Sequence, residues 1–277
     1  MRNIITIAHL TLAEAMRRRV VFAAALVALA FISLFAAAFF FGHREMLRDA
    51  HMSFPERQMG LAILTVVGFF AANFLSAVFA LLLPIDTLSG EIDSGVMQTL
   101  AAKPLDRAQI VLGKWAGHLL IAYVYLLVIC GGLLLIVRAV SGYVPVNFAP
   151  ALPLMLLEVT LLLSVSIAGS ARLNTITNAV VAVAFYAIAF VGGFVEQVGS
   201  VVGLPSARTI GIVVSLISPA DSLWRLAIYN MQPAIVRSLE TPLTTFSVPT
   251  FWMVWWAMGF TVLTLVYAVR TFARRNL

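Results

Sequence analysis

Charge is the scarcest feature of this chain of 277 residues, because Asp, Glu, Lys and Arg together make up only 11% of it. Soluble globular domains carry about 25% charged residues, whereas here 62% of the residues are hydrophobic and the mean hydropathy is +1.01. These values exclude an ordinary soluble domain and predict that lipid surrounds most of the protein. Cys130 is the single cysteine, which excludes an intrachain disulfide framework and a cysteine-rich metal site.

Signatures of nucleotide and nucleophile chemistry are also lacking. Gly113-Lys114 resembles the end of a phosphate-binding loop, but Ala108 stands where that loop has its first glycine and Trp115 where it has a serine or threonine. A phosphate cradle needs those glycine amides and the magnesium-binding hydroxyl. No histidine is placed against a candidate serine nucleophile. We therefore expect a chain that is not an enzyme and binds no cofactor of its own.

Metal ligands of a suitable type occur in one place only. Imidazole and thioether groups suit copper, and two of each lie within residues 43–52, as His43, Met46, His51 and Met52. Four such side chains in a predicted loop are a weak pattern, because methionine is common where a chain leaves the membrane. We expect no metal site.

Six apolar runs are long enough to cross a membrane. At about 1.5 Å per residue, runs of 20 to 23 residues cover a hydrocarbon core of about 30 Å. The first run, 22 residues, exceeds the core of a signal peptide and is expected to be retained. The sequence thus predicts an all-α membrane protein, a single transmembrane domain over residues 1–277, with spans at 20–41, 61–83, 115–137, 151–171, 175–195 and 250–269.

The segments outside the spans carry helix signals of their own. Residues 3–18 form an amphipathic pattern that is too polar to span, with Asn3 as its expected N-cap, and we expect this helix to lie in the inner membrane interface. Ser53 and Glu56 have the spacing of a capping box. Residues 196–249 are predicted to form helices on the outer face, one of which starts at Ser218-Pro219-Ala220-Asp221.

The distribution of basic residues sets the expected orientation. Lys and Arg number eleven in the 61 residues of segments 1–19, 84–114, 172–174 and 270–277, against seven in the 86 residues of the opposite segments. Cytoplasmic loops carry such an excess, so we expect both termini to lie in the cytoplasm. We expect the protein to lie in the inner membrane of the cell. The basic residues stand at the ends of apolar runs, so we expect lipid headgroups and not nucleic acid as their partner.

One polar stretch is far longer than a turn between two spans requires. Residues 89–114 separate the second and third predicted spans. Within them, Val96, Leu100 and Lys103 share one helical face, and Pro104 ends the pattern. Gly113 and Gly117 form a pair of small residues that permits a close helix contact. The residues alone leave two interpretations open: a helix that docks on a soluble partner, or an interfacial loop without one.

The order of residues in this stretch is similar to that of the type-2 ABC exporter permeases. The resemblance rests on Gly90-Glu91-Ile92-Asp93-Ser94-Gly95, Leu100, Lys103-Pro104, Arg107 and Gly113-Lys114. The segment around residues 218–221 further resembles one branch of the family, the permeases of nitrous-oxide-reductase maturation systems. Val96 departs from the family pattern, which often has threonine, and this affects pairing with a partner.

The resemblance implies a cytoplasmic coupling helix that sits on a separate ABC ATPase subunit, where ATP and magnesium bind. It also implies a second permease copy, so that a homodimer is expected. The residues expected to couple to the ATPase are Glu91, Asp93, Gly95, Val96, Met97, Leu100, Lys103 and Arg107.

Two polar side chains interrupt the predicted spans, Asn73 in the second and Glu158 in the fourth. A carboxylate in hydrocarbon costs on the order of 3 kcal/mol, so Glu158 must face protein or water. Both residues are candidates for a translocation path, and an alternative function is an ion-coupled secondary transporter or channel that uses Glu158. The structural interpretations are a helix–helix hydrogen bond for Asn73 and, for Glu158, a partner such as Arg138 or the Thr160 and Ser164 neighbourhood.

Overall fold

The computed structural model describes residues 2–90, 106–145, 148–232 and 247–274. Regular secondary structure in these residues is entirely α-helical. The helices are α1 (Arg2–Ala15), α2 (Arg19–Arg48), α3 (Phe54–Leu82), α6 (Arg107–Ser141), α7 (Phe148–Ser170), α8 (Thr175–Val202), α9 (Pro205–Ile217), α10 (Ala220–Met231) and α12 (Trp252–Ala273).

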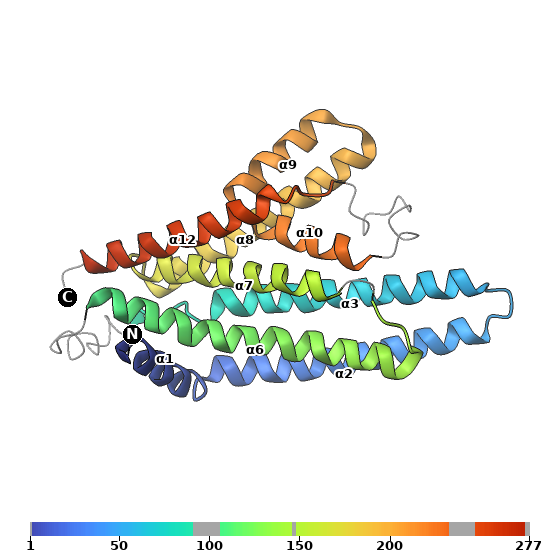
Figure 1. Cartoon of the computed structure of the whole chain (residues 1–277), viewed down its shortest axis with the longest axis horizontal. Coiled ribbons are helices and arrows are strands. Elements are labelled where there is room, and N and C mark those ends of the chain that lie inside the picture. The colour runs from blue at the N-terminus through green and yellow to red at the C-terminus, as the bar shows by residue number, and fades with distance from the viewer. Residues whose placement is uncertain (1, 91–105, 146–147, 233–246, 275–277) are drawn as a thin grey trace.

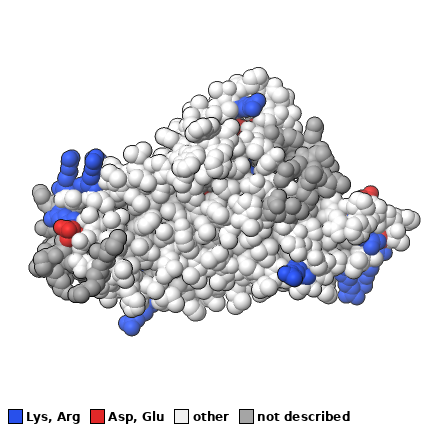
Figure 2. Space-filling view, viewed as in Figure 1, with Lys and Arg blue, Asp and Glu red and all other residues white. Residues whose placement is uncertain are grey.

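Six of these helices, α2, α3, α6, α7, α8 and α12, are long and apolar enough to cross a membrane. Each predicted span overlaps one of them, so the predicted all-α membrane fold is confirmed. Figure 2 shows most charged side chains toward the two ends of the long axis, a broad uncharged surface between them, and a further basic group on the projection that α8 and α9 form. This pattern fits a protein whose middle lies in hydrocarbon.

Helix α7 forms the centre of the bundle. In its most apolar stretch 72% of the residues are buried, against 17% in α2 and in α12. Helices α2, α3, α6 and α7 run alongside one another, while α8 and α9 form a hairpin that projects from them (Figure 1). Helix α10 packs against α7 and α8, and α9 and α10 meet at an angle of 109°, which makes them either a broken span or a re-entrant pair.

Both labelled termini lie at the same end of the bundle, which we call the terminal end (Figure 1). Helix α3 ends there and α6 begins there, so the described parts of the predicted docking stretch (residues 89–114) lie at that end. Residues 91–105 of the stretch lie outside the described residues. The opposite end holds the connection between α2 and α3, and we call it the hairpin end after this pair of helices and not after α8 and α9. The predicted capping box is present in that connection, where the backbone N–H of Ser53 donates to Glu56 Oε2 at 2.7 Å.

Two predicted helix caps differ from those observed. Helix α10 has Pro219 as its N-cap and begins at Ala220, and Ser218 makes no cap hydrogen bond there. Helix α1 begins at Arg2, so Asn3 lies inside the helix. The Asn3 amide donates instead to Gln109 Oε1 of α6, at 3.1 Å. In this case a contact with another helix has replaced local capping.

The predicted close helix contact at Gly113 and Gly117 is present, and its partner is α1. A Cβ at Gly117 would lie 2.8 Å from the carbonyl oxygen of Ala8 and 2.8 Å from Thr11 Cβ. At Gly113 it would lie 2.7 Å from Ile7 Cβ. The two glycines therefore let the amphipathic helix lie directly on the start of α6.

We expect Gly117→Ala to destabilise the protein because the new methyl group must push α1 away. Gly131→Ala is the matched control, since Gly131 lies in the same helix and a Cβ there meets nothing within 4 Å. Both changes gain helix propensity, but only Gly117→Ala overpacks a contact, so the two variants should differ by about 2 kcal/mol in unfolding free energy. Thermal unfolding in detergent measures this difference, and equal shifts for both variants would show that α1 does not rest on Gly117.

Candidate functional site

The polypeptide that leads into the docking stretch is fixed by several helices. We call residues 83–90, which follow α3, the junction segment. The side-chain amide of Asn178, in α8, donates to the backbone carbonyl of Ile85 at 2.9 Å. The hydroxyls of Ser89 and Thr175 lie 3.1 Å apart, again joining the segment to α8. A movement of residues 91–105 would therefore be transmitted to α3 through the chain itself and to α8 through these side-chain contacts.

Helix α6 contacts the junction segment through a buried histidine. His118 Nε2 lies 3.3 Å from Thr87 Oγ1, and its Nδ1 lies 2.8 Å from the backbone carbonyl of Lys114. His118 and Lys114 are both buried. Helix α1 and the junction segment thus cover this part of α6.

Arg18 joins the amphipathic helix to the junction segment. Its guanidinium donates to Glu14 Oε1 at 2.6 Å and also to Asp86 Oδ1. Burial alone would raise the pKa of Glu14, but the hydrogen bond from Arg18 and the positive charge of Arg18 outweigh it, so this pKa lies below its usual value. Helix α1 thus has a charged contact immediately before the docking stretch.

Arg107, the described member of the predicted coupling set, lies at the start of α6. Its Nη1 is 3.1 Å from the backbone carbonyl of Ala273, at the C-terminus of α12. An arginine at that position also offsets the negative end of the α12 dipole. The remaining predicted coupling residues lie outside the described residues: Glu91, Asp93, Gly95, Val96, Met97, Leu100 and Lys103.

The two polar residues predicted inside spans contact each other. The side-chain amide of Asn73, in α3, donates to Glu158 Oε2, in α7, at 3.0 Å. Asn73 is 3% exposed and Glu158 1% exposed. The interpretation of Asn73 as a helix–helix hydrogen bond is thus confirmed. The partners suggested for Glu158 are not observed, because Arg138 is exposed and Thr160 and Ser164 bond elsewhere.

A second buried group of charges was not foreseen from the sequence. Arg225 of α10 lies 2.9 Å from Glu196 of α8 and 2.8 Å from Asp221 of its own helix. Ser247 Oγ donates to Glu196 Oε1, which ties the segment before α12 to the same group. We call Glu196, Asp221 and Arg225 the charged triad. The signal available in the sequence was the i,i+4 spacing of Asp221 and Arg225 in an amphipathic helix, but the pairing with Glu196 depends on how α8 and α10 pack.

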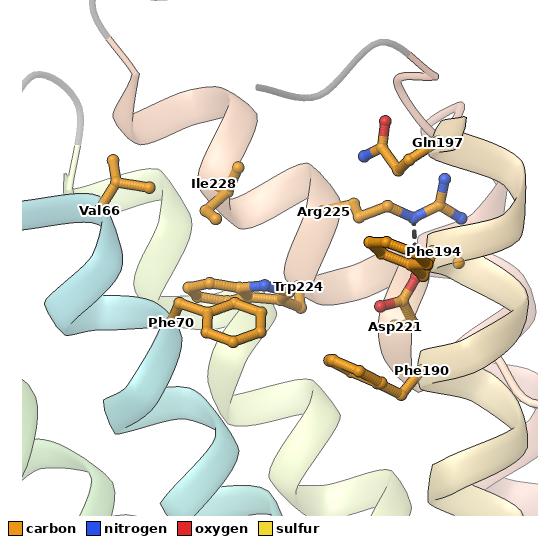
Figure 3. A pocket seen from close by; sticks show the side chains of 10 residues that line it. Val66, Phe70, Phe190, Phe194, Gln197, Asp221, Trp224, Arg225 and Ile228 are labelled. Atoms are coloured by element: carbon orange, nitrogen blue, oxygen red, sulfur yellow. Dashed lines mark ion pairs between the residues drawn. The ribbon is translucent and has the colours of Figure 1, made fainter. Parts of the chain in front are cut away.

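Two members of the triad, Asp221 and Arg225, line a cavity of about 200 Å³ between α3, α8 and α10. Figure 3 shows Phe70 beside Trp224, Phe190 below Asp221 on α8, and the ion pair of Asp221 and Arg225 next to Phe194. Val66, Ile228, Gly193 and Gln197 complete the lining. The cavity therefore combines aromatic walls with a charged end.

Of the four side chains considered for copper, His43 and Met46 lie in α2, whereas His51 and Met52 follow that helix. No group of three or more His, Cys, Asp or Glu that could hold a metal ion occurs in the described residues. His51 lies exposed in the turn between α2 and α3.

Arg18→Gln is expected to weaken the link between α1 and the junction segment. Both side chains of the Arg18–Asp86 pair are partly exposed, so the contact is worth up to about 1 kcal/mol. We expect the variant to lose up to about 1 kcal/mol of unfolding free energy, measured by thermal unfolding in detergent. Arg17→Gln, at an exposed neighbouring arginine, is the control. The swap Arg18→Glu with Asp86→Arg should restore the unfolding free energy, and a swap as unstable as Arg18→Gln would contradict the role of the pair.

Comparison with known proteins supports the resemblance seen in residues 90–114. The profile of the family described as ABC-2 family transporter protein matches residues 5–277. The probable ABC transporter permease protein NosY of Pseudomonas aeruginosa is 34% identical over 116 residues, which cover 42% of this chain and 38% of that relative. The protein of the same description from Stutzerimonas stutzeri is 48% identical over 50 residues, 18% of each chain.

The alignments with these curated relatives thus cover less than half of the relatives' lengths, whereas the family profile covers nearly the whole chain. The matched residues include all six membrane-length helices. The protein is therefore a multi-pass membrane protein that belongs to the ABC-2 family of transporter proteins.

Proposed function

We propose that this chain is the membrane permease subunit of an ABC exporter, driven by a separate ATPase that binds residues 91–105 from the cytoplasm. The observation that carries the proposal is the junction segment, because it connects the docking stretch to α1, α6 and α8 by side-chain contacts. A loop without a mechanical role does not need such attachments. The excess of Lys and Arg in the segments of the terminal end supports its cytoplasmic location in the inner membrane.

In this mechanism the ATPase subunit holds ATP and magnesium, and this chain carries the motion. Closure of the ATPase pair moves residues 91–105. The junction segment passes that movement to α8 through Asn178 and to α1 through Arg18. Packed helices move as units and not as deformable springs, so the expected result is a tilt of α3, α6 and α8 against their neighbours that opens a path for the substrate.

A second copy of the chain is part of the proposal. The first half of helix α8 exposes an apolar face that includes Ile176, Val180 and Val183. Lipid or another permease can cover such a face, and the family resemblance favours the permease. We therefore propose a homodimer that carries two ATPase subunits.

Charge reversal in the docking stretch tests the proposal. The chain is co-expressed with its candidate ATPase, and the complex is purified through a tag on one partner. Glu91→Lys with Asp93→Lys should reduce co-purification and abolish the stimulation of transport by ATP. The matched control is Glu45→Lys with Asp49→Lys, the same charge change at exposed positions of the hairpin end. Absence of a complex for the unmodified chain, or intact coupling in the Glu91 and Asp93 variant, would refute the proposed function.

A further inference from the structure

Four aromatic side chains, Phe70, Phe190, Phe194 and Trp224, line the cavity between α3, α8 and α10. Phe70 stands between Phe190 and Trp224, with ring centroids 6.1 and 5.9 Å away. Phe194 closes another side and is 56% exposed, so that wall is accessible from outside the bundle (Figure 3). Aromatic faces carry negative electrostatic potential and attract cations.

The charged end of the cavity has one negative charge in surplus. The guanidinium of Arg225 is shared between Asp221 Oδ2 at 2.8 Å and Glu196 Oε2 at 2.9 Å. It also donates to Ser215 Oγ at 3.2 Å. Two carboxylates thus surround one cation, and the donors of Arg225 are directed at partners within the protein. The arginine is therefore poorly placed to bind an anion in the cavity.

Asp221 has one carboxylate oxygen to spare. Its Oδ2 pairs with Arg225, whereas the described residues provide no hydrogen bond or ion pair to Oδ1. The side chain is 8% exposed, lines the cavity, and packs against Gly193, where a Cβ would collide with the carboxylate. Oδ1 is therefore the acceptor that Asp221 can offer to a ligand or a water in the cavity.

We propose that this cavity is a binding site for a small organic cation, in which an ammonium group lies against Asp221 and its apolar substituents lie among Phe70, Phe190, Phe194 and Trp224. The volume of about 200 Å³ fits a ligand smaller than the drug-sized molecules that fill pockets of about 300–1,000 Å³. The site depends on the packing of α3, α8 and α10 and not on the ATPase partner. A negative result for cation binding would therefore leave the proposed function intact, and failure of the ATPase to bind would leave this site intact.

Binding of benzyltrimethylammonium to the full chain in lipid nanodiscs tests this site. Isothermal titration calorimetry should show saturable binding of this cation and none of benzylsulfonate, an anion of similar size. Asp221→Asn should weaken binding by about tenfold or more, because it removes the surplus charge. Absence of saturable binding, or equal binding of the two ions, would overturn the proposal.

A second variant keeps the test decisive if Asp221→Asn fails to fold. Phe194→Leu changes an accessible wall and leaves the charged triad intact, and the loss of one cation–aromatic contact should weaken binding by about three- to thirtyfold. Val191→Ala is the control, an exposed residue of α8 outside the cavity lining. Unchanged affinity for the cation in Phe194→Leu would overturn the site.

Discussion

Replacing Arg225 by methionine is expected to lower the stability of the protein by about 3–5 kcal/mol. The reason is that Glu196 and Asp221 would remain buried without a positive partner, and breaking a buried ion pair from one side costs that much. For a protein of this size the loss corresponds to a fall of roughly 10 °C in the thermal unfolding midpoint. Circular dichroism in detergent micelles measures it.

Two further variants separate lost charge from lost side-chain volume. Arg208→Met changes an exposed arginine of α9 and should leave the unfolding midpoint almost unchanged. Arg225→Met combined with Glu196→Gln and Asp221→Asn removes the uncompensated charges and should recover most of the loss. If the combined variant is as unstable as Arg225→Met, the charged triad does not determine the stability of this region.

Replacing Asn73 by leucine is expected to cost about 1–3 kcal/mol, because Glu158 would lose the one hydrogen bond described for its side chain. The double variant Asn73→Leu with Glu158→Leu removes both polar groups and should be close to the unmodified protein. Such a double-mutant cycle isolates the contribution of the pair. Thermal unfolding of the four proteins in detergent provides the measurement, and additive losses would contradict a direct contact.

Glu158→Gln separates this structural role from the alternative function, an ion-coupled transporter. Glutamine keeps a hydrogen-bonding oxygen toward Asn73 but has no ionisable group. ATP-driven transport should therefore continue in the variant. Loss of a gradient-driven flux that the unmodified chain performs in liposomes without any ATPase would instead support the ion-coupled alternative.

The elements that periodicity and length determine were predictable from the sequence. The six spans follow from apolar runs that are long enough to cross the hydrocarbon core. The amphipathic helix follows from the helical spacing of its apolar residues. The Ser53 capping box was predictable too, because its two residues stand three apart and need nothing else. Gly113 and Gly117 indicated a close contact, but the sequence could not identify α1 as the partner.

The contacts between distant polar residues were not predictable in the same way. Arg18 and Asp86 are 68 positions apart, and Asn73 and Glu158 are 85 apart. A charged or amide side chain close to or within an apolar run indicates that the side chain has a polar partner. The sequence does not identify that partner. Asn3 shows the same limit, because a local capping rule lost to a tertiary hydrogen bond with Gln109. Such contacts depend on how each helix is rotated about its axis and how far it is shifted along the bundle. A sequence pattern does not determine either quantity.

Cross-linking from the docking stretch tests the central proposal most directly. In a Cys130→Ala background, which removes the single native cysteine, Met97→Cys introduces a thiol in the docking stretch and Ala50→Cys introduces one at the hairpin end. Each variant is assembled with the ATPase and treated with a thiol-attached photo-cross-linker. We expect a cross-link to the ATPase from position 97 and none from position 50. A cross-link from position 50, or none from position 97 in an assembled complex, would contradict the proposed docking of the ATPase at residues 91–105.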